Sequence, residues 1–149
     1  MDRAYVTDNT GERQRLRTLI ASLSDDDLQR LLPNGWTVAI TLAHLAFWDR
    51  QRLALVRRWE RSGVQPAPAD ADTINEAVRV LASALPPRVA TQLALDAAEA
   101  IDQAVEQLSA DVLAEIEAGG QGSLLRRALH RRGHLDRIED ALRAQPAAE

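Results

Sequence analysis

The sequence contains no cysteine and no lysine. Without cysteine, the chain can form no disulfide, no thiolate zinc site and no cysteine nucleophile, and nothing in it indicates an oxidising compartment. All 18 basic residues are arginine, which excludes the lysine of a Schiff base and the lysine of a P-loop. The two absences remove several common classes of enzyme from consideration.

Aromatic residues are also scarce, at 3% of the chain, and the apolar part consists mainly of Ala, Leu, Val and Ile. This composition favours helices, since sheets are enriched in β-branched and aromatic residues. With 46% apolar and 27% charged residues, the chain is expected to be globular rather than disordered. Its length of 149 residues predicts a single domain spanning 1–149.

Charge and apolar runs predict neither a nucleic-acid partner nor a membrane partner. The net charge of −4 gives little attraction for a phosphate backbone. The start, MDRAYVTDNTGERQ, lacks the apolar stretch of a signal peptide. The longest nearly unbroken apolar run, residues 38–48, is too short to span a bilayer. We therefore expect a cytoplasmic protein.

Apolar residues recur at helical spacing along most of the chain, without strand-like alternation. Ser24 and Asp27 have the spacing of a capping box, and Thr37 and Ser109 can cap the helices that follow them. The pattern predicts an all-α four-helix bundle with short accessory helices, ending in a frayed tail at 144–149. The predicted helices cover about residues 10–22, 37–62, 74–85, 87–108 and 123–143, with short pieces after Ser24 and Ser109. In the helix at 87–108, the residues expected to face inward are Val89, Leu93, Ala97, Ala100, Ala104 and Leu108.

Two of the three histidines, His130 and His134, lie four residues apart in the last predicted helix. That spacing puts both rings on one face, so that two imidazoles can bind one ion at about 2.0–2.1 Å. His44, in the helix predicted for 37–62, shares its apolar face with Trp48 and should point toward the bundle interior. Three neutral nitrogens leave coordination positions open, as catalytic metal sites require. On the residues alone, a purely structural role for the histidines is equally open.

The segment GWTVAITLAHLAFWDRQRL, residues 35–53, is followed some eighty residues later by H-x3-H in the last helix. Before it come a first helix and LSDDDLQRL. Over nearly the whole chain this order of elements resembles the DinB-like superfamily. That bacterial group of helical bundles includes relatives of mycothiol-dependent maleylpyruvate isomerase and of bacillithiol transferase.

The resemblance implies a four-helix bundle with a divalent metal at one end, held by His44, His130 and His134. We expect the metal to be zinc or nickel. Family members commonly form homodimers, and those with known chemistry activate a small thiol or a water toward an electrophilic substrate. Since this chain has no cysteine, a low-molecular-weight thiol would have to come from outside. The residues after His134 are Leu-Asp-Arg, where many relatives have Arg-Gly-Gln, so the resemblance implies the metal site rather than a particular substrate.

The leading hypothesis is therefore a metal-dependent enzyme acting on a small molecule, a thiol-dependent transferase or isomerase. The alternatives are a metal-binding stress or sequestration protein without turnover, and a helical interaction module with structural histidines. Arg131 and Arg132 are candidates to orient an anionic substrate, since arginine matches a carboxylate with two donors. Gly133 costs a helix roughly 0.5–1 kcal/mol relative to alanine, which suggests close packing or substrate room beside His134.

Overall fold

The computed structural model describes residues 3–68 and 70–144. Within these ranges the chain forms helices and no strand, which confirms the all-α prediction. None of the described helices is long and apolar enough to cross a membrane. The helices are α1 (Ala4–Ser22), α2 (Asp25–Gln29), α3 (Val38–Ser62), α4 (Ala71–Ser83), α5 (Pro87–Gln107), α6 (Ala110–Ala118), the 3₁₀-helix η1 (Gly122–Leu125) and α7 (Arg127–Arg143).

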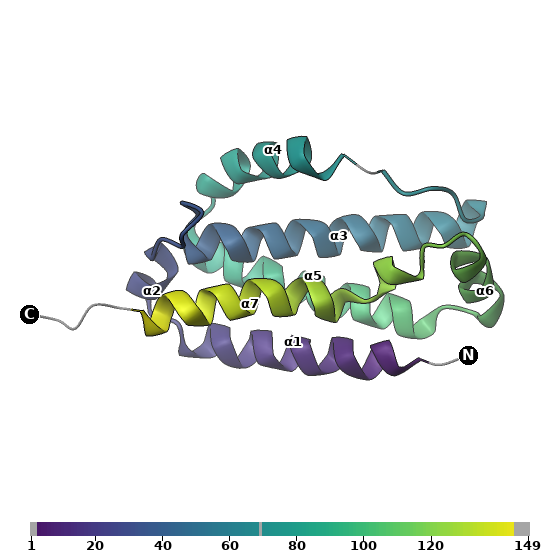
Figure 1. The fold of residues 1–149 in the computed structure, drawn as a ribbon, viewed down its shortest axis with the longest axis horizontal. Helices are drawn as coiled ribbons and strands as arrows, with labels where there is room; N and C mark the ends of the chain where they lie inside the picture. The colour runs from purple at the N-terminus through teal and green to yellow at the C-terminus, as the bar shows by residue number, and fades with distance from the viewer. Residues whose placement is uncertain (1–2, 69, 145–149) are drawn as a thin grey trace, which may run out of the picture.

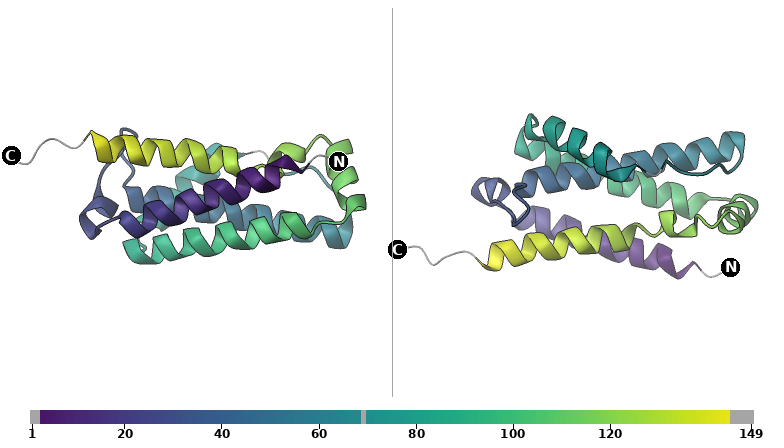
Figure 2. Two further views of the ribbon diagram at one scale, coloured as in Figure 1. Left: turned by 90° about the horizontal axis from the view of Figure 1, so that it is seen from below. Right: turned by 45° about the horizontal axis from the view of Figure 1, so that its top comes forward.

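Four long helices, α1, α3, α5 and α7, form the bundle and lie along the long axis of the molecule (Figure 1). α1 and α7 run in the same direction, since Asn9 bonds with Ala128 and Arg15 pairs with Glu139. α4 runs back along α3, so that α5 begins near the start of α3 and runs parallel to it (Figures 1 and 2). α2 packs against α3 and α5 at this end, and α6 lies at the other. Because α4 leads the chain back, the bundle consists of two pairs of parallel helices that lie side by side, α1 with α7 and α3 with α5.

The predicted helix caps are confirmed. The Ser24 hydroxyl accepts from the Asp27 amide and the Asp27 carboxylate accepts from the Ser24 amide, which completes the capping box of α2. Thr37 accepts from the Ile40 amide at the start of α3, and Ser109 caps α6 in the same way. Each cap satisfies backbone donors that have no partner within the helix.

α1 begins at Ala4, earlier than the predicted start at residue 10. The first two turns contain few apolar residues, so the periodicity of the sequence gives no indication of a helix there. Tertiary contacts hold them instead: Tyr5 and Asn9 are buried, and the Arg3 guanidinium donates to the carbonyls of Glu106 and Leu108 at the end of α5. Packing therefore overrides weak local preference at this end of the chain.

The buried face of α5 differs from the prediction. Val89 and Leu93 were expected to face inward, but they are 44% and 38% exposed. The residues that face α3 in this part of the helix are alanines, which are almost fully buried. Small side chains let two helix backbones approach closely, and this close approach of α3 and α5 leaves the larger side chains outside. The buried alanines are Ala90, Ala94, Ala97 and Ala98.

The last helix begins four residues later than predicted, at Arg127, because the segment before it forms η1. The residue before α7 provides no side-chain cap. Instead Asn9 of α1 accepts from the Ala128 amide and donates to the Leu125 carbonyl, so a neighbouring helix caps α7. Apart from residue 144, the tail predicted at 144–149 lies outside the described residues.

Candidate metal centre

The structure brings the three histidines together from two neighbouring helices. His44 lies in the first half of α3 and is 4% exposed, with the Trp36 ring 5.0 Å from its own. His130 and His134 project from the first half of α7 and are half-buried. The centres of the three rings are 4.7–5.3 Å apart. α3 and α7 thus form the two walls of a histidine cluster.

The spacing of the nitrogens suits a metal ion. Nε2 of His44 lies 3.3 Å from Nε2 of His130, and one ligand nitrogen from each histidine falls within 4.8 Å of the others. Two nitrogens bound to one tetrahedral ion at about 2.0–2.1 Å lie about 3.3–3.4 Å apart. The three histidines could therefore hold a divalent ion.

The surroundings keep the imidazoles neutral. Burial, followed by the charges of nearby histidines and arginines, lowers the pKa of His44 to about 4, and burial with Arg137 lowers that of His134 to about 4. The pKa of His130 falls to about 2, through burial and then the charge of Arg127. A neutral imidazole has the free electron pair that a metal requires, so protons do not compete at neutral pH.

These pKa values predict how the stability of the metal-free protein depends on pH. A histidine of the unfolded chain titrates near 6.5, so between about pH 6.5 and 4 the unfolded chain binds more protons than the folded one. The free energy of unfolding should decrease as the pH falls through this range, by up to about 1.4 kcal/mol per pH unit for each histidine. Urea denaturation of chelator-treated protein at pH 7, 6 and 5 measures the slope. His134→Gln should reduce it, and a stability unchanged from pH 7 to 5 would contradict the prediction.

A pocket of about 420 Å³ opens beside the histidines. Trp36 precedes α3, Trp48 lies one turn beyond His44, and Asn75 of α4 accepts a hydrogen bond of 2.8 Å from the Trp48 indole nitrogen. Three arginines also line the pocket: Arg52, Arg127 and Arg137. Its volume is within the range typical of small-molecule sites. The histidine nitrogens are therefore accessible to a ligand of that size.

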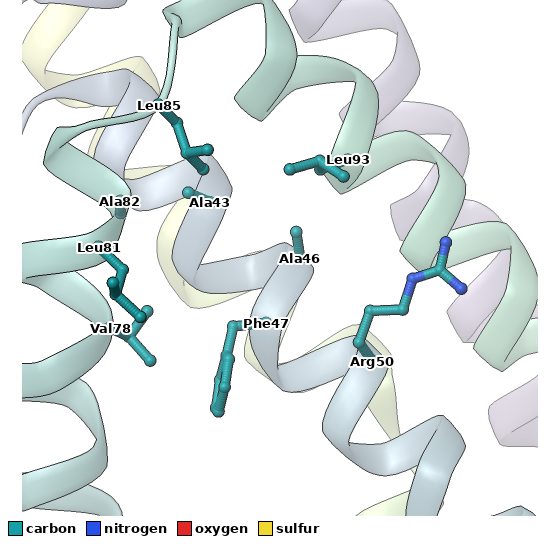
Figure 3. A pocket seen from close by; sticks show the side chains of 9 residues that line it. All are labelled: Ala43, Ala46, Phe47, Arg50, Val78, Leu81, Ala82, Leu85 and Leu93. Atoms are coloured by element: carbon teal, nitrogen blue, oxygen red, sulfur yellow. The ribbon is translucent and has the colours of Figure 1, made fainter.

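A second cavity, of about 400 Å³, lies between α4, α3 and α5 (Figure 3). In this view Val78 and Leu81 of α4 lie across the cavity from Leu93 of α5, with Phe47 of α3 between them. Arg50 at its edge is the one charged residue among the described residues that line it. Apart from Arg50, the described lining contains only apolar side chains and no metal-binding group, so the histidine pocket is the candidate site.

Comparison with known families agrees with this fold and histidine pattern. The sequence model of the DinB superfamily matches residues 9–145, a range that includes all three histidines. The chain belongs to the DinB superfamily. Neither the curated proteins nor the solved structures compared with it gave a match.

In this DinB-superfamily protein, Arg131 is a structural residue rather than a substrate ligand. It is fully buried and lies outside the histidine pocket. Its guanidinium donates to the carboxylates of Asp49 and Asp102 and to the carbonyls of Asn9 and Ala98. Burial alone would lower the pKa of Arg131, but the two carboxylates outweigh that effect and raise it. One side chain of α7 thus contacts all three other helices of the bundle.

Arg132 also lies away from the pocket. It is on the outer face of α7, where its Nε donates to Glu12 of α1 over 2.9 Å. Neither of the two arginines considered from the sequence is therefore placed to orient a substrate at the histidines. The arginines that line the pocket are Arg52, Arg127 and Arg137, and only the packing of α3 against α7 brings them together.

Asp49 is a further residue that the sequence analysis missed. It is 1% exposed, and it accepts from Arg127 over 2.7 Å and from Arg131 over 3.1 Å. Arg127 in turn places Nη2 3.1 Å from Nδ1 of His130. A guanidinium can only donate, so this nitrogen accepts and Nε2 of His130 carries the proton that points to His44. An ion held by Nε2 would require the other neutral tautomer, with the proton on Nδ1, and Arg127 would then no longer donate to that nitrogen.

Gly133 provides neither of the roles suggested from the sequence. An added Cβ would meet no atom within 4 Å, so no close packing depends on it, and the residue does not line the histidine pocket. Gly133→Ala should therefore raise the free energy of unfolding by about 0.5–1 kcal/mol, because alanine loses less conformational entropy in a helix. Urea denaturation measures the change. Gly120→Ala is the contrasting variant, since its φ of +69° disfavours alanine; a loss of stability in Gly133→Ala would disprove the expectation.

Proposed function

We propose that this protein is a metal-dependent enzyme of small-molecule chemistry, a thiol-dependent transferase or isomerase. The observation that carries the proposal is the cluster of three neutral histidine nitrogens in the wall of a pocket of about 420 Å³. A structural role alone would not require the nitrogens of three imidazoles to converge beside an open pocket. His44, His130 and His134 are the proposed ligands, and zinc or nickel is the proposed metal.

When bound, such a metal would lower the pKa of a thiol or water and so supply a nucleophile at neutral pH. The chain itself provides the surroundings for this chemistry. The rings of His44 and Trp36 lie 5.0 Å apart in the lining of the pocket, and Asn75 accepts a hydrogen bond from the Trp48 indole. Because the chain has no cysteine, the thiol of a transferase reaction must be a diffusible cofactor. The pocket is large enough to admit a small molecule.

Metal content tests the first part of the proposal. Protein purified without chelator should contain one divalent transition metal per chain by elemental analysis. Added zinc or nickel should raise the melting temperature of the stripped protein, because an ion that binds only the folded state stabilises it. Protein that contains no transition metal and melts at the same temperature with and without these ions would refute the metal centre.

Turnover tests the second part. Metal-loaded protein is incubated with bacterial low-molecular-weight thiols and a panel of electrophiles, and products are followed by mass spectrometry. We expect a product that requires the metal and is lost in His130→Ala but kept in Leu129→Ala, whose side chain is 61% exposed next to it. Stoichiometric metal without any metal-dependent product would favour the alternative, a metal-binding protein without turnover. The homodimer implied by the resemblance stays a prediction that light scattering can measure.

A further inference from the structure

Arg52 and Arg137 line the histidine pocket, and neither forms an ion pair within the part of the chain that the structure describes. Arg127, the third arginine there, is held by Asp49 and lies against His130. The described structure gives Arg137 no hydrogen bond and no ion pair, and Arg52 bonds only to the neutral side chain of Gln51. Among residues 3–68 and 70–144, neither arginine forms an ion pair with a carboxylate, in contrast to Arg131 and Arg132, although the charge of Asp49 acts on Arg52 from a distance.

The position of Arg52 is unusual for an unpaired charge. It is half-buried on α3, and its guanidinium lies 5.2 Å from the centre of the Trp48 ring, which restricts its orientation. Its Nε is buried without a hydrogen-bond partner in the described part of the chain. Burial, and next the charge of Arg127, lowers the pKa of Arg52. A donor in this situation is stabilised by an anion that enters the pocket.

The rest of the pocket supports the same conclusion. No acidic side chain is among the described residues that line it, and Asp49 behind it is shared between Arg127 and Arg131. A divalent ion at the histidines would add two further positive charges. Arg137 is exposed at the edge of the pocket and lies near His44 and His134, whose pKa values it lowers. The excess positive charge attracts anions, and partial burial strengthens the effect.

We propose that the substrate of this pocket is a small organic anion, with its charged group bound by Arg52 and Arg137 and its body packed against Trp36 and Trp48. This inference rests on the proposed metal-dependent function and names the substrate class of the same site. The two indoles provide the apolar surface that an organic body requires. The charged group can be a carboxylate or a phosphate, since arginine binds both through paired N–H donors.

Binding of matched probes tests the inference. Calorimetry measures the dissociation constants of phenylacetate, its uncharged analogue phenylacetamide, phenyl phosphate and inorganic phosphate, with zinc-loaded and zinc-free protein. We expect phenylacetate or phenyl phosphate to bind at least about tenfold more tightly than phenylacetamide, as hydrogen bonds to charged groups provide. The comparison of the two aromatic anions identifies the preferred head group. Inorganic phosphate should bind more weakly than the preferred aromatic anion.

The variants separate recognition from a structural role. Arg52→Gln and Arg137→Gln should each weaken binding of the preferred anion by about tenfold and leave phenylacetamide unchanged. Arg50→Gln is the matched control, because Arg50 is two residues away on α3 and lines the apolar cleft instead. Zinc stoichiometry and melting temperature are measured for each variant. A merely structural arginine would change these two properties without changing the preference for the anion.

The outcomes distinguish this inference from the proposed function. Equal affinity for phenylacetamide and both aromatic anions, or unchanged anion affinity in both variants, would overturn it, whether or not zinc is bound. If inorganic phosphate bound as tightly as the aromatic anions, the inference that the substrate has an organic body packed against Trp36 and Trp48 would be overturned. Stoichiometric zinc without any anion preference refutes the inference alone. A protein that takes up no zinc but prefers the anion through Arg52 and Arg137 refutes the metal centre and supports the anion site.

Discussion

Arg131→Ala should lower the free energy of unfolding by about 3–5 kcal/mol, the usual cost of breaking a buried ion pair from one side. The variant leaves the carboxylates of Asp49 and Asp102 buried, at 1% and 6% exposure, without their shared guanidinium. It also removes the donors to the carbonyls of Asn9 and Ala98. In a chain of this length, such a loss lowers the melting temperature by roughly 10 °C. Calorimetry of metal-free protein measures it.

Arg132→Ala is the control, because it removes the next guanidinium in the chain from a half-exposed ion pair with Glu12. Solvent screens an exposed pair, so its loss costs little stability and this variant should melt close to the wild type. If Arg131→Ala does not fold, Asp102→Asn keeps one carboxylate and weakens the cluster less. An Arg131→Ala variant as stable as Arg132→Ala would contradict the structural role of Arg131.

His44→Ala should reduce zinc affinity by more than the roughly 10–100-fold that loss of a residue behind a metal ligand costs. It removes the nitrogen that lies 3.3 Å from Nε2 of His130 and leaves only the pair on α7. A competition assay with a chromogenic chelator measures the dissociation constant. Zinc should then no longer raise the melting temperature at concentrations that stabilise the wild type, because that effect depends on the ratio of free zinc to dissociation constant.

Leu129→Ala is the control for this variant too, since Leu129 is exposed on α7 and does not line the histidine pocket. The melting temperature of metal-free His44→Ala shows whether the helices still pack. His134→Ala removes a half-buried ligand from the other helix and should also lower zinc affinity. Unchanged zinc affinity in both histidine variants would show that the ion binds elsewhere or not at all.

Most helices could be predicted from the sequence because the residues that cap them lie within a few positions of each helix start. Ser24 with Asp27, and Thr37, mark helix starts through hydrogen bonds within a few residues. The start of α1 could not, since Tyr5 and Asn9 are buried by helices more than a hundred residues further along the chain. The inward face of α5 was predicted correctly at Ala97 but not at the start of the helix, where Val89 and Leu93 are exposed. The close approach of α3 favours small residues at the contact, and the sequence pattern of α5 alone does not reveal it.

Some residues of the candidate site could likewise be predicted from the sequence, and others could not. The spacing of His130 and His134 identified one face of a helix, and the apolar face of the helix predicted for 37–62 made His44 a third candidate. The family resemblance then joined the three as one ligand set. The role of Arg131 could not be derived, because a buried arginine and an exposed one have the same local pattern. Arg131 and Arg132 are adjacent, yet one is fully buried and the other is exposed to solvent. The arginines of the pocket depend likewise on which helices meet.

The buried cluster around Arg131 has a consequence for how this protein can diverge in evolution. Arg131 joins α7 to α1 and α5 through hydrogen bonds with Asn9 and Asp102. None of these three residues lines the histidine pocket. In the described structure, Arg52 and Arg137 form no hydrogen bond with these three residues, so substitutions at either position should leave the hydrogen bonds of Arg131 intact. Substitutions at Arg52 and Arg137 can therefore change which ligand the pocket prefers, while selection for stability acts separately on the residues around Arg131.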